Sequence, residues 1–319
     1  MRKLGLPTGG GLVASGTVTV PATPRPRGLR QWIAAHPLLS VVLLTYALTW
    51  AVLVPIALES HGWLPLSVPA FAVILAAWGP AIAAVVVSLS LGGRSGLRAY
   101  IGRLLCWRVH PGWYVVVLLG PAAYLLAGVA IARVLGWSAS PLPIDGFPPA
   151  QVALSLVLML LLAALINTEE FAWRGLALPL LQRRSNALVA SLLLGTIHTF
   201  WHLPYFFTLG RPFYEQVGFP LFAAWTLALT LIFTWIYNST HGNLLLPVLL
   251  HAGQFAWQQL LSPPEVAPFF ISVGLLWIVV VGILVRYGPA TLSPAPAATL
   301  PAALSRRIAG ERRAVGDTA

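Results

Sequence analysis

The sequence predicts an all-α fold, a polytopic bundle of transmembrane helices, and three observations support this prediction. Hydrophobic residues make up 58% of the 319-residue chain and charged residues only 8%. A soluble domain has roughly a quarter of its residues charged, so lipid must be the main solvent of this chain. About eight apolar segments are long enough, or nearly so, to cross a bilayer. Their residues lack the polar alternation of barrel strands, which leaves helices as the spanning structure.

The elements follow from hydropathy in chain order. The stretch 1–35 is basic and rich in proline, which predicts a disordered tail. A membrane domain follows over 36–288, and 289–319 is predicted to be a second disordered basic tail. Within the membrane domain, the predicted spans are approximately 38–58, 66–91, 112–135, 151–173, 187–207, 219–237, 244–261 and 268–286.

The basic residues predict the orientation of these spans. With the N-terminus in the cytoplasm, 17 of the 19 Lys and Arg residues fall on the cytoplasmic side. Arg133 and Arg211 are the two exceptions, and four acids lie with them. We therefore expect both termini in the cytoplasm. This pattern explains the net charge of +11 without a nucleic-acid partner, and the arginine-rich composition favours a bacterial cell membrane as the location.

Two adjacent glutamates stand near the end of the fourth predicted span. A carboxylate in hydrocarbon costs about 2.5–3.5 kcal/mol on insertion scales, so Glu169 and Glu170 are candidate functional residues. Glu170 and Arg174 are four residues apart and can pair on one helix face. Glu169 points about 100° away on the same helix, which leaves it free for proton chemistry. The alternative is an ordinary ion pair at a helix end, with Glu169 solvated.

Three histidines on later spans could be partners of the glutamates. His198 and His202 are four residues apart, a spacing that can chelate a metal. The metalloprotease signature needs a glutamate directly after the first histidine, and here Thr199 follows. His251 follows an apolar run and needs a polar partner if it is buried. Alternatively, each histidine could simply hydrogen-bond across helices as part of the packing.

Three stretches together resemble the motifs of a known family. NTEEFAWRGLALPLLQ is similar to the first motif of the CPBP intramembrane proteases, also called the Abi family, which include CAAX prenyl proteases and bacteriocin-processing enzymes. FWHLPYF resembles the second motif and places His202 at its histidine. TWIYNSTHGNLLLPVLLHA resembles the third and fourth motifs and places His251 at the last histidine. The resemblance covers about 165–256, within a family-like core of about 150–262.

The resemblance implies a metal-independent glutamic endopeptidase without a cofactor. It implies that Glu169 is the general base on a water that His202 positions, and that His251 stabilises the oxyanion. Glu170 and Arg174 would pair to hold the helix. The cavity would open toward the cytoplasmic side of the cell membrane. The expected substrate is a peptide or protein at the bilayer.

Two positions depart from the family pattern. His198 stands where an aromatic residue is usual, and it joins the supporting residues. Phe255 stands where an asparagine is common, with Gln254 beside it on a different part of the helix surface. Two alternatives stay open, the first favoured by Phe255 and the second by the four available nitrogen and oxygen ligands. One is a catalytically degenerate membrane scaffold or immunity or resistance protein. The other is a zinc-dependent protease that binds metal through Glu169 and the three histidines.

Overall fold

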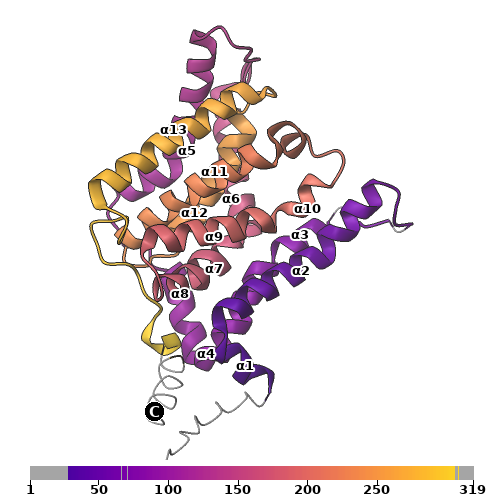
Figure 1. The fold of residues 1–319 in the computed structure, drawn as a ribbon. Coiled ribbons are helices and arrows are strands. Elements are labelled where there is room, and N and C mark those ends of the chain that lie inside the picture. Colours follow the sequence, from indigo (N-terminus) through magenta and orange to yellow (C-terminus); the bar gives the residue numbers. More distant parts are fainter. Residues whose placement is uncertain (1–27, 66, 70, 306–307, 309–319) are drawn as a thin grey trace, which may run out of the picture.

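The computed structural model describes residues 28–65, 67–69, 71–305 and 308, and all regular secondary structure in these ranges is helical (Figure 1). The polytopic helical bundle predicted from the sequence is confirmed. The elements are α1 (Leu29–Ala35), α2 (Pro37–Ser60), α3 (Ala72–Ala77), α4 (Gly79–Leu104), α5 (Gly112–Val134), α6 (Pro149–Ile166), α7 (Glu169–Ala172), the π-helix η1 (Trp173–Ala177), α8 (Leu178–Gln182), α9 (Ala187–Trp201), α10 (Leu203–Phe206), α11 (Pro212–Ser239), α12 (Leu245–Leu261) and α13 (Val266–Tyr287).

Length and hydropathy identify six helical segments in the described chain that can cross a membrane. They are α2, the continuous run of α3 and α4, α5, α6, α11 and α13. The shorter helices α9 and α12 have 15 and 17 residues and pack among them. The protein is therefore a multi-pass membrane protein. The count of eight spans and the cytoplasmic location of both termini remain predictions.

Small residues let the helices of the bundle approach closely. The backbone of α12 lies so near α5 that a side chain at Gly253 would meet the carbonyl oxygen of Val117 at 2.9 Å. On the interface of α9 and α11, a side chain at Gly195 would meet Leu227 at 2.9 Å and Thr230 at 3.3 Å. Small residues at helix contacts favour packing within lipid, where no hydrophobic effect drives helices together.

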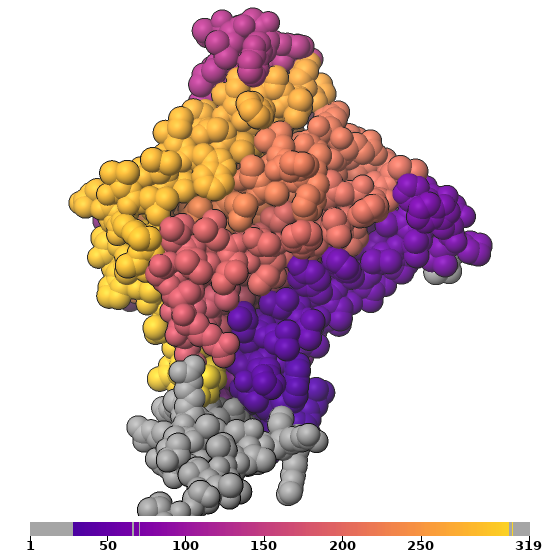
Figure 2. Space-filling view, in the orientation of Figure 1, coloured from indigo at the N-terminus to yellow at the C-terminus, as the bar shows by residue number. Residues whose placement is uncertain are grey.

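Two stretches expected in disordered tails are ordered: Leu29–Ala35 forms α1, and 289–305 packs against the bundle. Buried Asn238 of α11 holds the second stretch, since its Nδ2 donates to the carbonyl oxygen of Thr291 (2.8 Å) and its Oδ1 accepts from the backbone N–H of Ala298 (3.0 Å). Ala298 and Leu304 share a buried cluster with Ile33 of α1. Figure 2 shows the yellow C-terminal stretch and the indigo N-terminal helices at the same end of the molecule. The remainders of both predicted tails, 1–27, 306–307 and 309–319, lie outside the described residues.

Candidate active site

The glutamates begin a helical segment instead of ending one. The predicted span 151–173 is interrupted, because α6 ends at Ile166 and Asn167 and Thr168 leave the helical path before α7 starts. The Thr168 hydroxyl donates to the carbonyl oxygen of Ala77 (2.6 Å) and accepts from the backbone N–H of Ala81 (3.3 Å). The break is therefore fixed to the start of α4, and it sets Glu169 and Glu170 inside the bundle.

The predicted pair of Glu170 and Arg174 forms. Arg174 Nη1 donates to Glu170 Oε1 at 2.9 Å, and both side chains are buried. The Arg174 guanidinium also lies 4.2 Å from the ring centre of Phe233. His251 donates from Nδ1 to the same Glu170 oxygen at 3.1 Å. Glu170 is thus a shared acceptor that holds an arginine and a histidine from two different helices.

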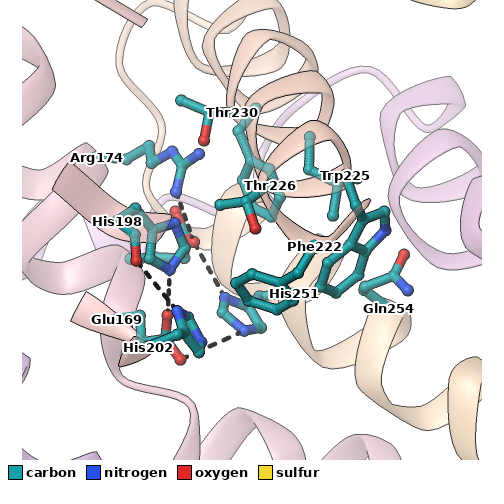
Figure 3. A pocket seen from close by; sticks show the side chains of 13 residues that line it. Glu169, Arg174, His198, His202, Phe222, Trp225, Thr226, Thr230, His251 and Gln254 are labelled. Carbon is teal, nitrogen blue, oxygen red and sulfur yellow. Dashed lines mark hydrogen bonds and ion pairs between the residues drawn. The ribbon is translucent and has the colours of Figure 1, made fainter. Parts of the chain in front are cut away.

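Glu169 has a closer partner than the sequence predicted. His198 donates from Nε2 to Glu169 Oε2 at 2.5 Å, and His251 Nε2 lies 3.8 Å from Glu169 Oε1 (Figure 3). His202 donates from Nδ1 to the carbonyl oxygen of His198 (3.1 Å), so its Nε2 remains for other partners. His198, which the sequence analysis placed among the supporting residues, therefore contacts Glu169 directly.

Side chains of helix α4 hold the segment formed by α7 and η1 in place through hydrogen bonds. Tyr100 donates from its hydroxyl to the carbonyl oxygen of Phe171 (2.6 Å), and Arg103 donates from Nη2 to that of Gly175 (2.6 Å). A side chain at Gly175 would meet the Tyr100 hydroxyl at 2.4 Å, so the contact needs glycine. These contacts stabilise the π-helix η1, which carries Arg174. π-Helical turns are frequent at functional sites.

A small inner chamber of about 60 Å³ lies in front of these groups. Its polar lining consists of Glu169, Glu170, Arg174, His198, His202, Thr226, Thr230, His251 and Gln254. The hydroxyls of Thr226 and Thr230 and the Nε2 of Gln254 are buried and have no hydrogen-bond partner within the described part of the chain. This volume and these unpaired groups suit a few water molecules.

A larger vestibule of about 700 Å³ adjoins the inner chamber. The two cavities share the side chains of Glu169, His202, Phe222, Trp225, His251 and Gln254, which therefore lie at their junction. The vestibule volume is in the range of ligand pockets. Its other lining groups include Tyr205, Tyr214, Phe255 and the amides of Gln258 and Gln259, a mixture of aromatic and hydrogen-bonding surfaces.

Gln254 and Phe255 occupy different parts of this arrangement. Phe255 lines the vestibule, whereas buried Gln254 reaches both cavities. Tyr124 of α5 donates from its hydroxyl to Gln254 Oε1 (2.5 Å), which orients the amide, and Trp225 Nε1 lies 3.5 Å from the same hydroxyl. The sequence did not identify Tyr124 and Trp225 as site residues, because no spacing distinguishes them from the other aromatic residues of the spans.

The donor set could also hold a metal ion. Ligand atoms of Glu169, His198 and His202 all lie within 4.8 Å of one another. One carboxylate and two imidazoles are ligands that zinc accepts. The spacing of these ligand atoms is compatible with a bound metal ion.

Comparison with known proteins connects this site to a family. A family model described as type II CAAX prenyl endopeptidase Rce1-like matches residues 149–256, which include all six predicted site residues. A curated relative, the CAAX prenyl protease 2 of Methanococcus maripaludis, is 30% identical over 177 residues. That alignment covers 53% of this chain and 64% of the relative, so the chain spans less than two thirds of the relative's length.

Proposed function

We propose that the protein is an intramembrane endopeptidase, because residues 149–256 match the family model described as type II CAAX prenyl endopeptidase Rce1-like. It hydrolyses a peptide bond of a membrane-associated peptide or protein, with water as the nucleophile. Glu169, His202 and His251 are the proposed catalytic residues. Glu170, Arg174 and His198 position them.

The proposed reaction begins at the junction of the two cavities. A water in the inner chamber gives one proton to Glu169 as its oxygen attacks the carbonyl carbon of the peptide. General-base help of this kind contributes about 10²–10⁴-fold to rate. His202, whose Nδ1 is bonded to the His198 carbonyl, offers Nε2 to orient the same water. The carbonyl electrons move to oxygen, which forms a tetrahedral oxyanion.

The oxyanion then needs hydrogen-bond donors. His251, in its doubly protonated form, donates from Nδ1 to Glu170 and has Nε2–H for the oxyanion. The unpaired Nε2 of Gln254 is a second donor near the junction, in place of the asparagine usual at position 255 in the family. When the intermediate collapses, the C–N bond breaks and the proton on Glu169 passes to the leaving nitrogen. Donors aimed at developing charge contribute most where water is scarce.

One observation supports this proposal above the others. A glutamate and three histidines from three separate helical segments line a water-sized chamber that joins a peptide-sized vestibule. A structural ion pair needs only Glu170 and Arg174. It does not account for Glu169 and His202 at the junction of two cavities.

The decisive experiment measures peptide cleavage by the purified protein in proteoliposomes. The substrates are internally quenched peptides, with and without a farnesylated cysteine near the C-terminus. We expect Glu169→Gln and His202→Ala to lower kcat by about 10²–10⁴-fold with the fold intact. Glu59→Gln, the same chemical change at a residue outside both cavities, is the matched control and should keep full activity. Full activity of Glu169→Gln would refute the mechanism, and a degenerate scaffold would cleave none of the peptides.

A zinc-dependent protease is the second candidate, because the ligand atoms of Glu169, His198 and His202 cluster closely. Bound zinc would activate water and polarise the carbonyl. Elemental analysis separates the candidates. Stoichiometric zinc that is lost in His198→Phe, with cleavage abolished by chelator, supports zinc. Full cleavage by metal-free protein supports the glutamate mechanism.

A further inference from the structure

The vestibule extends to one defined end of the bundle. Its lining includes Gly210–Tyr214 before and within the first turn of α11, and Ser262–Pro264 between α12 and α13. Hydrogen bonds tie the loops of this end together. His61 donates from Nε2 to the carbonyl oxygen of Phe207 (2.9 Å), and the backbone N–H of Ser140 donates to Glu265 Oε2 (3.1 Å). We call this end the vestibule end.

The opposite end is joined by its own hydrogen bonds. The backbone N–H of Leu244 donates to the carbonyl oxygen of Arg103 (3.2 Å), and Asn243 Nδ2 donates to that of Cys106 (2.6 Å). Backbone bonds also connect the start of α9 to 289–290, after the end of α13. Helix α1 lies at this end, below α4 and α8 in Figure 1. We call it the tail end, because both ends of the described chain are there.

The charges of the two ends differ sharply. The described residues of the tail end include eight arginines and no acid: Arg30, Arg94, Arg98, Arg103, Arg108, Arg183, Arg184 and Arg286. The vestibule end has two arginines and four acids: Arg133, Arg211, Glu59, Asp145, Glu215 and Glu265. Excess Lys and Arg in short loops identifies the cytoplasmic side of a membrane protein. By this rule we expect the tail end to face the cytosol.

We propose that the vestibule opens to the side of the membrane opposite the cytosol, and that the active site receives peptide segments presented on that side. This is the reverse of the cytoplasmic opening that the family resemblance implies. It deepens the proposed endopeptidase function and rests on it for the substrate. The substrate class is an extracytoplasmic peptide or the extracytoplasmic end of a membrane protein.

The lining of the vestibule agrees with this substrate class. Besides the histidines and Glu169, Arg211 is the one charged side chain among its lining residues. Gln216, Gln258 and Gln259 supply amide groups that both donate and accept hydrogen bonds, as a peptide backbone requires. A peptide that arrives in water at this end finds backbone partners before it reaches the junction with the inner chamber.

The chain contains a natural reporter for the test. Cys106 is the sole cysteine, and it is exposed at the tail end. Gln216 is exposed and lines the vestibule. Gln216→Cys combined with Cys106→Ser therefore provides a single cysteine whose labelling reports on which side of the membrane the vestibule end lies. Leu209→Cys, on an exposed loop of the vestibule end, is a second reporter in case Gln216→Cys does not fold.

The experiment treats intact bacterial spheroplasts that express each variant with a membrane-impermeant maleimide, before and after permeabilisation. We expect Gln216→Cys and Leu209→Cys to be labelled in intact spheroplasts, and wild-type Cys106 to be labelled only after permeabilisation. Labelling of Cys106 in intact spheroplasts, or of the vestibule-end cysteines only after permeabilisation, would overturn the proposal. Because labelling does not depend on cleavage, an inactive protein with this labelling pattern would contradict the peptidase and leave the orientation standing.

Discussion

His198 Nε2 lies 2.5 Å from Glu169 Oε2, so the side chain at a position usually aromatic in the family is the direct partner of the proposed base. A hydrogen bond to a charged group contributes about 1.5–3 kcal/mol. We predict that His198→Phe lowers kcat at least about tenfold and leaves KM nearly unchanged, because Glu169 loses its orientation. Peptide cleavage in proteoliposomes measures both constants. His110→Phe, in an exposed loop, is the control, and an unchanged kcat in His198→Phe would contradict the assigned role.

The tight contact between Gly175 and Tyr100 predicts a stability effect. An alanine methyl group at 175 would meet the Tyr100 hydroxyl at 2.4 Å and force η1 away from α4. Overpacking of this kind costs about 1–3 kcal/mol, so we expect Gly175→Ala to lower the free energy of unfolding by that amount. Unfolding in mixed micelles measures it. Gly282→Ala is the matched control, since no described atom lies within 4 Å of the added methyl group. Equal stability of the two variants would contradict the close packing.

Asn238 is predicted to hold the stretch 289–305 on the bundle. Its side chain also exchanges hydrogen bonds with Gln182, so the replacement Asn238→Ala leaves several buried groups unpaired. Each such group costs about 1–3 kcal/mol. We expect faster hydrogen exchange and proteolysis within 289–305 in this variant. Gln151→Ala, which removes an exposed amide in the first turn of α6 at the vestibule end, is the control and should leave exchange in that stretch unchanged. Full protection of 289–305 in Asn238→Ala would show that other contacts suffice.

Arg211 predicts a preference for acidic groups in the substrate. It lines the vestibule, and its guanidinium lies 5.4 Å from the Tyr205 ring centre. A partly exposed ion pair contributes about 0.2–1 kcal/mol, so Arg211→Gln should raise KM a few-fold for peptides with an acidic residue beside the cleaved bond. Neutral peptides should keep their KM. Arg133→Gln, at the same end of the bundle but outside both cavities, is the control. An equal rise for both peptides would exclude charge recognition.

Glu265 predicts an acid-dependent loss of stability. The hydroxyl and backbone N–H of Ser140 donate to its carboxylate and hold the pKa of Glu265 below its ordinary value. The carboxylate therefore stabilises the folded protein above the ordinary carboxyl pKa, and this contribution disappears as pH falls through the lowered pKa. We expect the Tm difference between wild type and Glu265→Gln to be largest near neutral pH and to shrink in acid. A difference that is constant with pH would contradict this linkage.

Hydropathy and local spacing predicted the features that depend on neighbouring residues. The apolar segments indicated a helical bundle, and the four-residue spacing predicted the pair of Glu170 and Arg174. The break after Ile166 could not be predicted, because Thr168 is held by Ala77, which is 91 residues away. A continuous apolar run gives no sign of such a contact.

The partners of Glu169 and Gln254 also depend on distant packing. The position of His198 follows from how α9 lies beside η1, and the amide of Gln254 is oriented by Tyr124, 130 residues earlier. The stretch 289–305 has the proline and alanine content of a tail, and only its bonds to Asn238 show that it is ordered. Composition describes the solvent that a segment prefers, but it does not identify a partner across the bundle.

The difference in size between the inner chamber and the vestibule limits the shape of the substrate. An α-helix with its side chains is about 10–12 Å across, whereas the inner chamber has a volume of only about 60 Å³. In the proposed reaction the attacking water lies in this chamber, and the carbonyl groups of an intact helix are hydrogen-bonded within the helix, so a helical substrate must unwind around the bond to be cut before that carbonyl can be attacked. Unwinding costs least where glycine or proline already weakens a helix, by about 1–3 kcal/mol per residue. Selection among substrates thus depends on how easily their backbone becomes extended, in addition to which side chains they carry.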